Sequence, residues 1–104
     1  MKFIMKVKMA SGKEGNELLK DPEFGKKMQD VLTEIKAEAA YFTTIEGSRG
    51  GFIVVNLEDA SQLPAIAEPL FLWLKADIDW YPVMTPQDLG KATPAIAAAN
   101  KKWA

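Results

Sequence analysis

Cysteine and histidine are both absent from the 104 residues of this chain. The lack of cysteine excludes disulfides, thiol nucleophiles and thiolate metal sites. The lack of histidine excludes a Ser-His-Asp triad, any other histidine base, histidine ligation of haem and nearly all zinc sites. A metal could bind only through oxygen ligands, and the acidic residues nowhere have the spacing of a calcium loop. We therefore expect neither a metal nor a cofactor.

Long apolar segments and an excess of charge are also missing. No apolar run approaches the ~20 residues needed to span a bilayer, and residues 1–9 alternate in polarity, unlike a signal peptide. The 13 basic and 14 acidic residues leave a net charge of −1, which gives no long-range attraction for nucleic acid or anionic lipid. We expect a cytoplasmic protein with no nucleic-acid or membrane partner, folded as one domain over residues 1–104.

The first half of the chain predicts a strand, two helical segments and a hairpin. Residues 3–9 alternate as a half-buried strand does. A capping-box spacing at Ser11 indicates a short helix, and an Asp-Pro pair then begins an amphipathic helix expected over residues 22–38. The β-prone residues 40–46 and 52–57 flank a glycine-rich turn and predict a hairpin.

The second half predicts a helix, a strand and a helical tail. Ser61 or Asp59 is the candidate cap of this helix, and Pro69 is expected to kink or split it. Residues 77–84 alternate again. Thr85 has the position of a helix cap, and Pro94 indicates a second helix start before an alanine-rich end.

The resulting order, βαββαβ followed by helical pieces, predicts an α+β fold of the ferredoxin-like type. Residues 1–84 would form a four-stranded antiparallel sheet with helices on one face, and residues 85–104 a C-terminal helical extension. The other sheet face carries Ile4 and stays open unless something packs on it. A second copy, sheet to sheet, is the simplest cover, so we expect a homodimer or a higher multiple. We also expect Trp103 to dock on its own subunit or on the partner.

Several segments resemble the dimeric α+β barrel superfamily, in particular muconolactone isomerase and its small uncharacterised bacterial relatives. These segments are FIMKVKM at residues 3–9, the glycine-led strand 51–57, Pro-Leu-Phe at 69–71 and Asp-Ile-Asp at 77–79. The resemblance implies a barrel made by two sheets and, for an enzyme, cofactor-independent proton transfer. The chain departs from the isomerase pattern at Ile4, where the isomerases carry a histidine.

Three residues are candidates for catalysis in an isomerase-like reaction. Lys6 would polarise or protonate an oxyanion, and Asp79 on the neighbouring strand would act as a base or orient the lysine. The alternative for this pair is a structural ion pair across the strands. Glu68, in an apolar segment, would serve proton transfer if it were desolvated; the alternative is a solvated residue at a helix break.

Aromatic residues indicate a ligand-binding pocket for a planar small molecule, in which tyrosine hydroxyls give orientation. Cofactor-free monooxygenases of the same superfamily similarly rely on Trp, Tyr and Asn. The alternative is ordinary aromatic core and dimer interface. The candidate ligand-binding residues are Tyr41, Asn56, Trp73, Trp80 and Tyr81.

Three functions stay open from the sequence. The first is a barrel that binds a small apolar or aromatic ligand and isomerises it by proton transfer. The second is a non-catalytic ligand-binding or stress-associated barrel, and the third is a cofactor-free monooxygenase. A fully apolar pocket would favour binding, whereas Lys, carboxylate and Tyr groups around an enclosed cavity would favour an enzyme. Arg49, among glycines, could clamp an anion, but the solubility of a turn explains this residue adequately.

Overall fold

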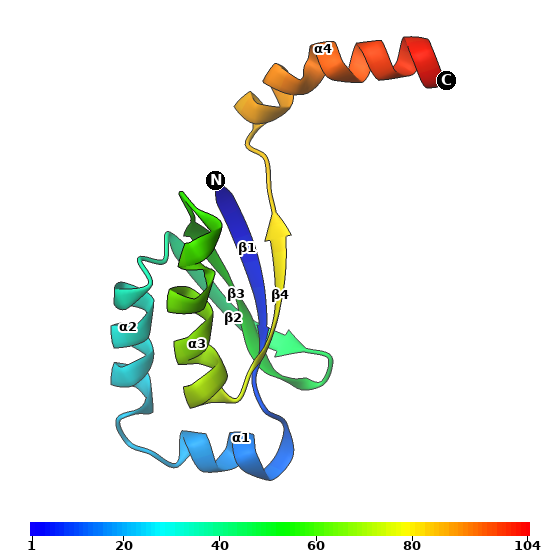
Figure 1. Cartoon of the computed structure of the whole chain (residues 1–104). Helices are drawn as coiled ribbons and strands as arrows, with labels where there is room; N and C mark the ends of the chain where they lie inside the picture. The colour runs from blue at the N-terminus through cyan, green and yellow to red at the C-terminus, as the bar shows by residue number, and fades with distance from the viewer.

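Four antiparallel strands form one sheet in the computed structural model, which describes all 104 residues (Figure 1). Helices lie along one side of this sheet, and a last helix extends beyond it. The elements in chain order are β1 (Lys2–Lys8), α1 (Gly12–Leu19), α2 (Phe24–Glu34), β2 (Ala39–Ile45), β3 (Ser48–Asn56), the 3-10 helix η1 (Ala60–Gln62), α3 (Leu63–Leu74), β4 (Asp77–Pro82) and α4 (Pro86–Trp103).

The strands are arranged in the order β2-β3-β1-β4. The first strand therefore lies inside the sheet, between the second strand of the hairpin and the last strand of the chain. In the register, Met5 lies opposite Ile53 on one side and opposite Trp80 on the other. The prediction of an α+β fold with four antiparallel strands and a C-terminal helix is confirmed.

The hydrophobic core fills the space between one sheet face and helices α2 and α3. Because strand residues alternate between faces, Met5 and Val7 are buried here while Lys6 points to the opposite face. Leu70 and Leu74 of α3 are almost completely buried against them. The buried apolar residues of this cluster are Met5, Val7, Met9, Val31, Ile35, Ile53, Val55, Leu57, Ile66, Leu70, Leu74 and Ala76.

Helix α2 is shorter than its apolar periodicity predicts, ending at Glu34 rather than near residue 38. The cause is a left-handed residue, Lys36, with φ of 55°. The N–H of Lys36 donates to the carbonyl of Thr33 at 3.1 Å, and the N–H of Ala37 donates to that of Leu32 at 3.0 Å. This pair of bonds satisfies the last carbonyls of the helix and turns the chain toward β2.

The prolines do not break the later helices as expected. Helix α3 runs without interruption through Pro69, and α4 runs through Pro94, where the sequence predicts a new helix start. Each proline removes one helical hydrogen bond, but the residues whose carbonyls lose a donor, Ala65 and Gly90, are solvent-exposed. Water can therefore reach the orphaned carbonyls.

The α4 helix stands apart from the rest of the molecule (Figure 1). It begins with a complete capping box, in which Thr85 and Asp88 exchange side-chain to backbone hydrogen bonds of 3.0 and 3.1 Å. It buries no residue, and Trp103 is 78% exposed, so it does not dock on its own subunit. The radius of gyration is 17.3 Å, whereas a compact domain of this length has about 13 Å. No helix, α4 included, is apolar over the length that a bilayer crossing requires.

Candidate functional site

The sheet face turned away from α2 and α3, called here the open face, carries the largest set of chemically varied side chains. The strand register arranges it in three rows that run across all four strands. The first row is Tyr81, Ile4, Val54 and Ala39; the second is Asp79, Lys6, Phe52 and Tyr41; the third is Asp77, Lys8, Gly50 and Thr43.

The rows grade from apolar to polar along the strands. Three aromatic side chains of the first two rows are largely uncovered: Tyr41 is 66% exposed, Tyr81 46% and Phe52 38%. Ile4 and Val54 lie side by side between them and are half-buried by their neighbours. Singly exposed apolar residues are ordinary, but a contiguous group of them is typical of a binding surface.

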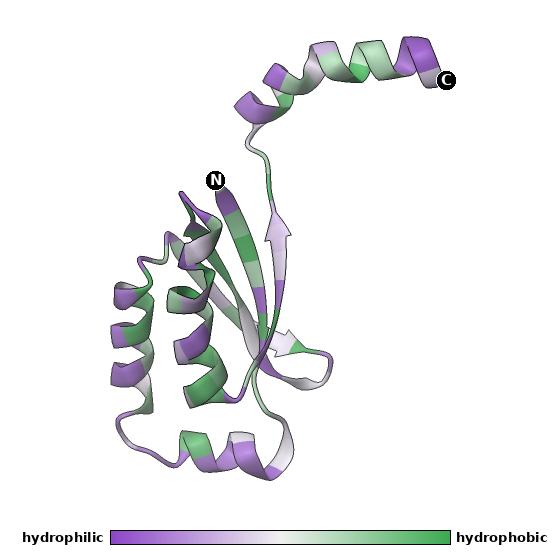
Figure 2. Ribbon diagram, viewed as in Figure 1, coloured by the Kyte–Doolittle hydropathy of each residue, from purple (hydrophilic) through white to green (hydrophobic).

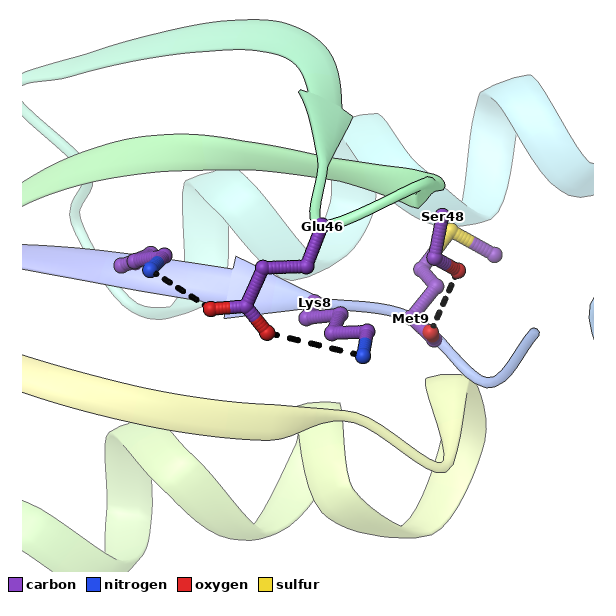
Figure 3. Close-up of polar contacts among 5 residues, drawn as sticks. Lys8, Met9, Glu46 and Ser48 are labelled. Carbon is purple, nitrogen blue, oxygen red and sulfur yellow. Dashed lines mark hydrogen bonds and ion pairs between the residues drawn. The ribbon is translucent and has the colours of Figure 1, made fainter.

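A charge cluster occupies the polar end of the open face (Figure 3). The carboxylate of Glu46 bridges two lysines of β1: its Oε1 lies 3.1 Å from Lys6 Nζ and its Oε2 3.6 Å from Lys8 Nζ. Farther along the same strand, Lys2 pairs with Glu38. Each lysine of β1 thus pairs with a glutamate that flanks β2, and because Lys6 and Lys8 share Glu46 their cluster keeps one net positive charge.

The hairpin turn places Glu46 above β1. Glu46 and Gly47 both have positive φ, 50° and 78°, and they close a two-residue loop between the paired residues Ile45 and Ser48. Ser48 fixes the turn, because its hydroxyl donates to the carbonyl of Met9 at 2.9 Å (Figure 3). The glycine-rich turn predicted over 47–51 is therefore shorter than expected.

Gly50 and Gly51 belong to β3 rather than to the turn. The backbone of adjacent strands comes so close that a β-carbon on Gly50 would lie 2.3 Å from Val7 O, and one on Gly51 would lie 2.5 Å from Tyr41 O. These two glycines serve close strand packing, which is the usual meaning of glycine inside a strand.

Lys6 and Glu46 stabilise each other's ionised forms. The hydrogen bond and attraction of Glu46 raise the pKa of Lys6 above its ordinary value, and the same contact with Lys6 lowers the pKa of the Glu46 carboxyl. Lys6 is therefore held as a cation over the whole physiological range. It can stabilise an oxyanion or donate a hydrogen bond, but it is unsuited to act as a base.

The sequence paired Lys6 with Asp79, and the structure places these residues directly opposite each other in the β1–β4 register. The lysine Nζ nevertheless bonds to Glu46, and Asp79 exerts only a weak charge effect on it. Sequence reasoning missed Glu46. The Glu-Gly dipeptide before β3 was the available signal, since a glycine in a two-residue hairpin loop fixes which neighbour sits at the tip.

Glu68 is separated from this cluster by the sheet. It belongs to α3, which packs on the other sheet face, and its side chain points to solvent. Solvent surrounds its side chain, so the desolvation that made it a candidate for proton transfer is not present in the single chain. It does not join Lys6 and Asp79 in one site.

The predicted aromatic pocket is divided between the two sides of the sheet. Tyr41, Tyr81 and Asn56 belong to the open face by register. Trp80 is on the helix-covered face, where its ring meets that of Phe3 edge to face at 5.7 Å.

Trp73 also lies on the helix-covered side. It belongs to α3 and packs on Phe24 at 5.1 Å, with the Lys27 ammonium 5.3 Å from its ring centre. Within one chain, the two tryptophans thus act as core and helix-packing residues.

The open face offers an apolar surface beside a charged hydrogen-bond donor, the lysine ammonium. The apolar body of a small molecule would lie on Ile4, Val54 and Phe52, and a polar oxygen near the Lys6 ammonium. No group of three or more acidic side chains lies close enough together to hold a metal ion. No family model and no curated protein matches this chain.

Proposed function

We propose that the chain is a small cytoplasmic protein of the dimeric α+β barrel type, which pairs through its open sheet faces and binds a small apolar or aromatic ligand between them. The observation that carries the proposal is the open face itself. Its first row, Tyr81, Ile4, Val54 and Ala39, is the apolar row; no helix covers this row, and it lies on the same face as the Lys6–Glu46–Lys8 cluster. The strand order β2-β3-β1-β4, with helices on one face, supports a ferredoxin-like arrangement.

The homodimer follows from the physical cost of leaving the open face in water. Tyr41, Phe52 and Tyr81 expose large apolar surfaces, and a chain of this size buries only about two thirds of its unfolded surface by itself. Two copies packed sheet to sheet would cover both faces and exclude water from the ion pairs, which strengthens their electrostatic effect on a bound oxygen.

The ligand proposal is tested by titrating 2-naphthol, a planar molecule with one hydroxyl, by isothermal calorimetry. We expect binding to the assembled protein, weakened about tenfold or more by Lys6→Met, because that change removes a charged hydrogen-bond donor and keeps much of the stem volume. Lys13→Met, on exposed α1, is the control and should leave the affinity unchanged. Equal affinities for the wild type and Lys6→Met would contradict the site.

A second candidate, cofactor-independent isomerisation, rests on the protonated state of Lys6 beside the exposed carboxylate of Asp79. In this reaction Asp79 takes a proton from carbon next to a carbonyl while Lys6 stabilises the developing oxyanion. A five-membered lactone incubated with the protein in D2O should lose its α-proton signal in the NMR spectrum. Lys6→Met should slow that exchange about a hundredfold, and exchange no faster than in buffer would leave the protein as a binding module.

The monooxygenase alternative has less structural support than the other two functions. The combination of Trp, Tyr and Asn that motivates it is split, since Trp80 lies under the helices and Asn56 on the open face.

A further inference from the structure

A pocket lies on the helix-covered side of the sheet, at the corner where the α1–α2 connection meets the β2–β3 hairpin. Its volume is about 420 Å³, which is within the range of small-molecule sites. The side chains that define it are Leu19, Phe24, Met28, Phe42, Met9 and Arg49.

The pocket is apolar and incompletely covered. Phe42 of β2 is 61% exposed and Leu19 of α1 is 40% exposed, although both belong to the helix-covered side of the molecule. The hydrophobic core of this chain therefore stays open at this corner, in contrast to its closed packing around Leu70. Two of the lining residues are methionines, whose unbranched side chains adapt to the shape of a ligand.

A narrow crevice adjoins the pocket on the side of the core. It measures about 30 Å³, shares Met9, Met28 and Phe42 with the pocket, and ends against Val7 and Leu74. If side chains such as Met28 move to join the two, the narrow crevice would admit the end of an unbranched chain but not a fused ring.

Arg49 is the only charged residue that lines the pocket. Its Nη1 donates to Asn16 Oδ1 at 3.0 Å, which ties it to α1, and it forms no ion pair with any carboxylate. A guanidinium has five N–H donors, so most of them remain available at the mouth of an apolar pocket. This charge is complementary to an anionic head group.

A larger groove beside α1, of about 660 Å³, differs from the pocket at Arg49 in the charge of its lining. It is lined by charges of both signs, from Lys13, Glu14 and Glu17 to Lys75, with only two apolar residues. Such a surface has no preference for an apolar anion, whereas the pocket at Arg49 combines an apolar wall with a single positive charge.

From this combination we infer that the pocket at Arg49 binds a medium-chain aliphatic carboxylate. The carboxylate pairs with the guanidinium, and the chain lies between Phe24, Met28 and Phe42 with its end in the crevice. This site is separate from the open face and does not depend on the function proposed for that face.

Gly25 provides a direct way to fill the pocket. It lines the pocket from the first turn of α2, and a β-carbon there would have no atom within 4 Å. Glycine is a poor helix former, so Gly25→Leu should keep α2 folded while its side chain occupies the pocket. Gly90 of α4 is the matched control, because it also has open space around a β-carbon and is remote from the pocket in the fold.

The test is calorimetric titration of sodium decanoate, below its micelle concentration, into the wild type, Gly25→Leu, Gly90→Leu and Arg49→Gln proteins. We expect Gly25→Leu to weaken binding by about tenfold or more and Gly90→Leu to leave it within about twofold. Arg49→Gln should weaken decanoate binding by about tenfold but leave the binding of the neutral methyl decanoate unchanged.

The inference is overturned if decanoate does not bind to the wild type, if Gly25→Leu binds it as the wild type does, or if Arg49→Gln weakens the acid and the ester equally. Circular dichroism of each variant verifies folding, and Gly25→Met replaces Gly25→Leu if the latter does not fold. Lys6→Met separates the two sites, since it should reduce 2-naphthol binding at the open face and leave decanoate binding intact.

Discussion

Helices α3 and α4 both carry apolar residues, 9 of 12 in α3 and 8 of 18 in α4, but they differ completely in what those residues meet. In α3, Leu70 is fully buried and Leu74 is 2% exposed. In α4, Leu89 is 49% exposed and Trp103 is 78% exposed, and the helix projects from the end of β4 with its apolar segments uncovered (Figure 2). A stripe of apolar residues therefore predicts a helix reliably, but it does not identify the surface that the helix meets.

The apolar stripe of α4 has the spacing of a helix that packs against a partner. Leu89, Ala92, Ile96, Ala99 and Trp103 follow one another at alternating steps of three and four residues. The helix interior also contains a glycine and a proline, which cost about 1 and 3 kcal/mol relative to alanine, so α4 would be marginal alone in water. We expect a second copy of the chain to cover it, because α4 continues directly from the strand that carries Tyr81 on the open face.

The largest expected effect is in the body of the molecule. Leu70→Ala should reduce the free energy of unfolding by about 2–5 kcal/mol, because it leaves a cavity in a closely packed core. Leu72→Ala, two residues away on the same helix and 68% exposed, should change it by less than about 0.5 kcal/mol. Urea unfolding followed by circular dichroism measures both, and similar losses for the two variants would contradict the assigned core.

A smaller effect is expected at the start of α4. Thr85→Ala removes a hydroxyl that accepts a hydrogen bond from the Asp88 N–H, and should destabilise α4 by about 1 kcal/mol. The loss should appear as faster amide exchange within α4, with little change in the body. Ser11→Ala is the control, since Ser11 occupies the cap position of α1 without forming a side-chain cap bond.

The cap of α4 should also depend on pH. The Thr85 N–H donates to the Asp88 carboxylate and lowers the pKa of Asp88. The contribution of the Asp88 carboxylate to the stability of α4 is therefore present above the ordinary aspartate pKa, and it is lost as the pH falls through the lowered pKa. Protection of the α4 amides, measured relative to the intrinsic exchange rate at each pH, that does not fall in acid would contradict this cap.

The smallest expected effect concerns the Lys6–Glu46 pair of the isolated chain, where both groups face solvent. Because the pKa of Glu46 is lowered, its contribution to stability is lost as the pH falls through that lowered pKa. Because the pKa of Lys6 is raised, its contribution is lost as the pH rises through that raised pKa. NMR titration of the Glu46 carboxyl measures the first shift, and Lys6→Met should return this pKa toward its ordinary value. Lys20→Met is the control, because Lys20 pairs with Glu17 instead.

The sheet was the most predictable part of the fold. Alternation in residues 3–9 and 77–84 assigned the buried faces of β1 and β4 correctly, and put Lys6 and Asp79 on one face. These assignments succeed because side-chain direction in a strand depends only on the parity of the residue number. The capping box at Thr85 was equally visible, since its residues are local.

The parts that the sequence did not predict depend on single backbone angles or on distant contacts. The positive φ of Lys36 ends α2 early. Glu46 also has a positive φ, and its carboxylate pairs with Lys6, so that Lys6 does not form the predicted ion pair with Asp79. Trp73 and Trp80 lie on the helix-covered side of the sheet, whereas Tyr41 lies on the open face. The number of aromatic residues in the sequence does not indicate on which side of the sheet each of them lies.

The most direct test of the account is the mass of the protein in solution, measured by light scattering at micromolar concentration. We expect twice the chain mass of 11.5 kDa, or a multiple of that dimer. Val54→Asp, at the centre of the apolar row, and Tyr81→Glu, on an edge strand, should each reduce the mass to that of one chain without loss of secondary structure. Leu72→Asp, on the outer side of α3, should leave it unchanged. A wild-type mass of 11.5 kDa would contradict the central claim that the open face is covered by a second copy.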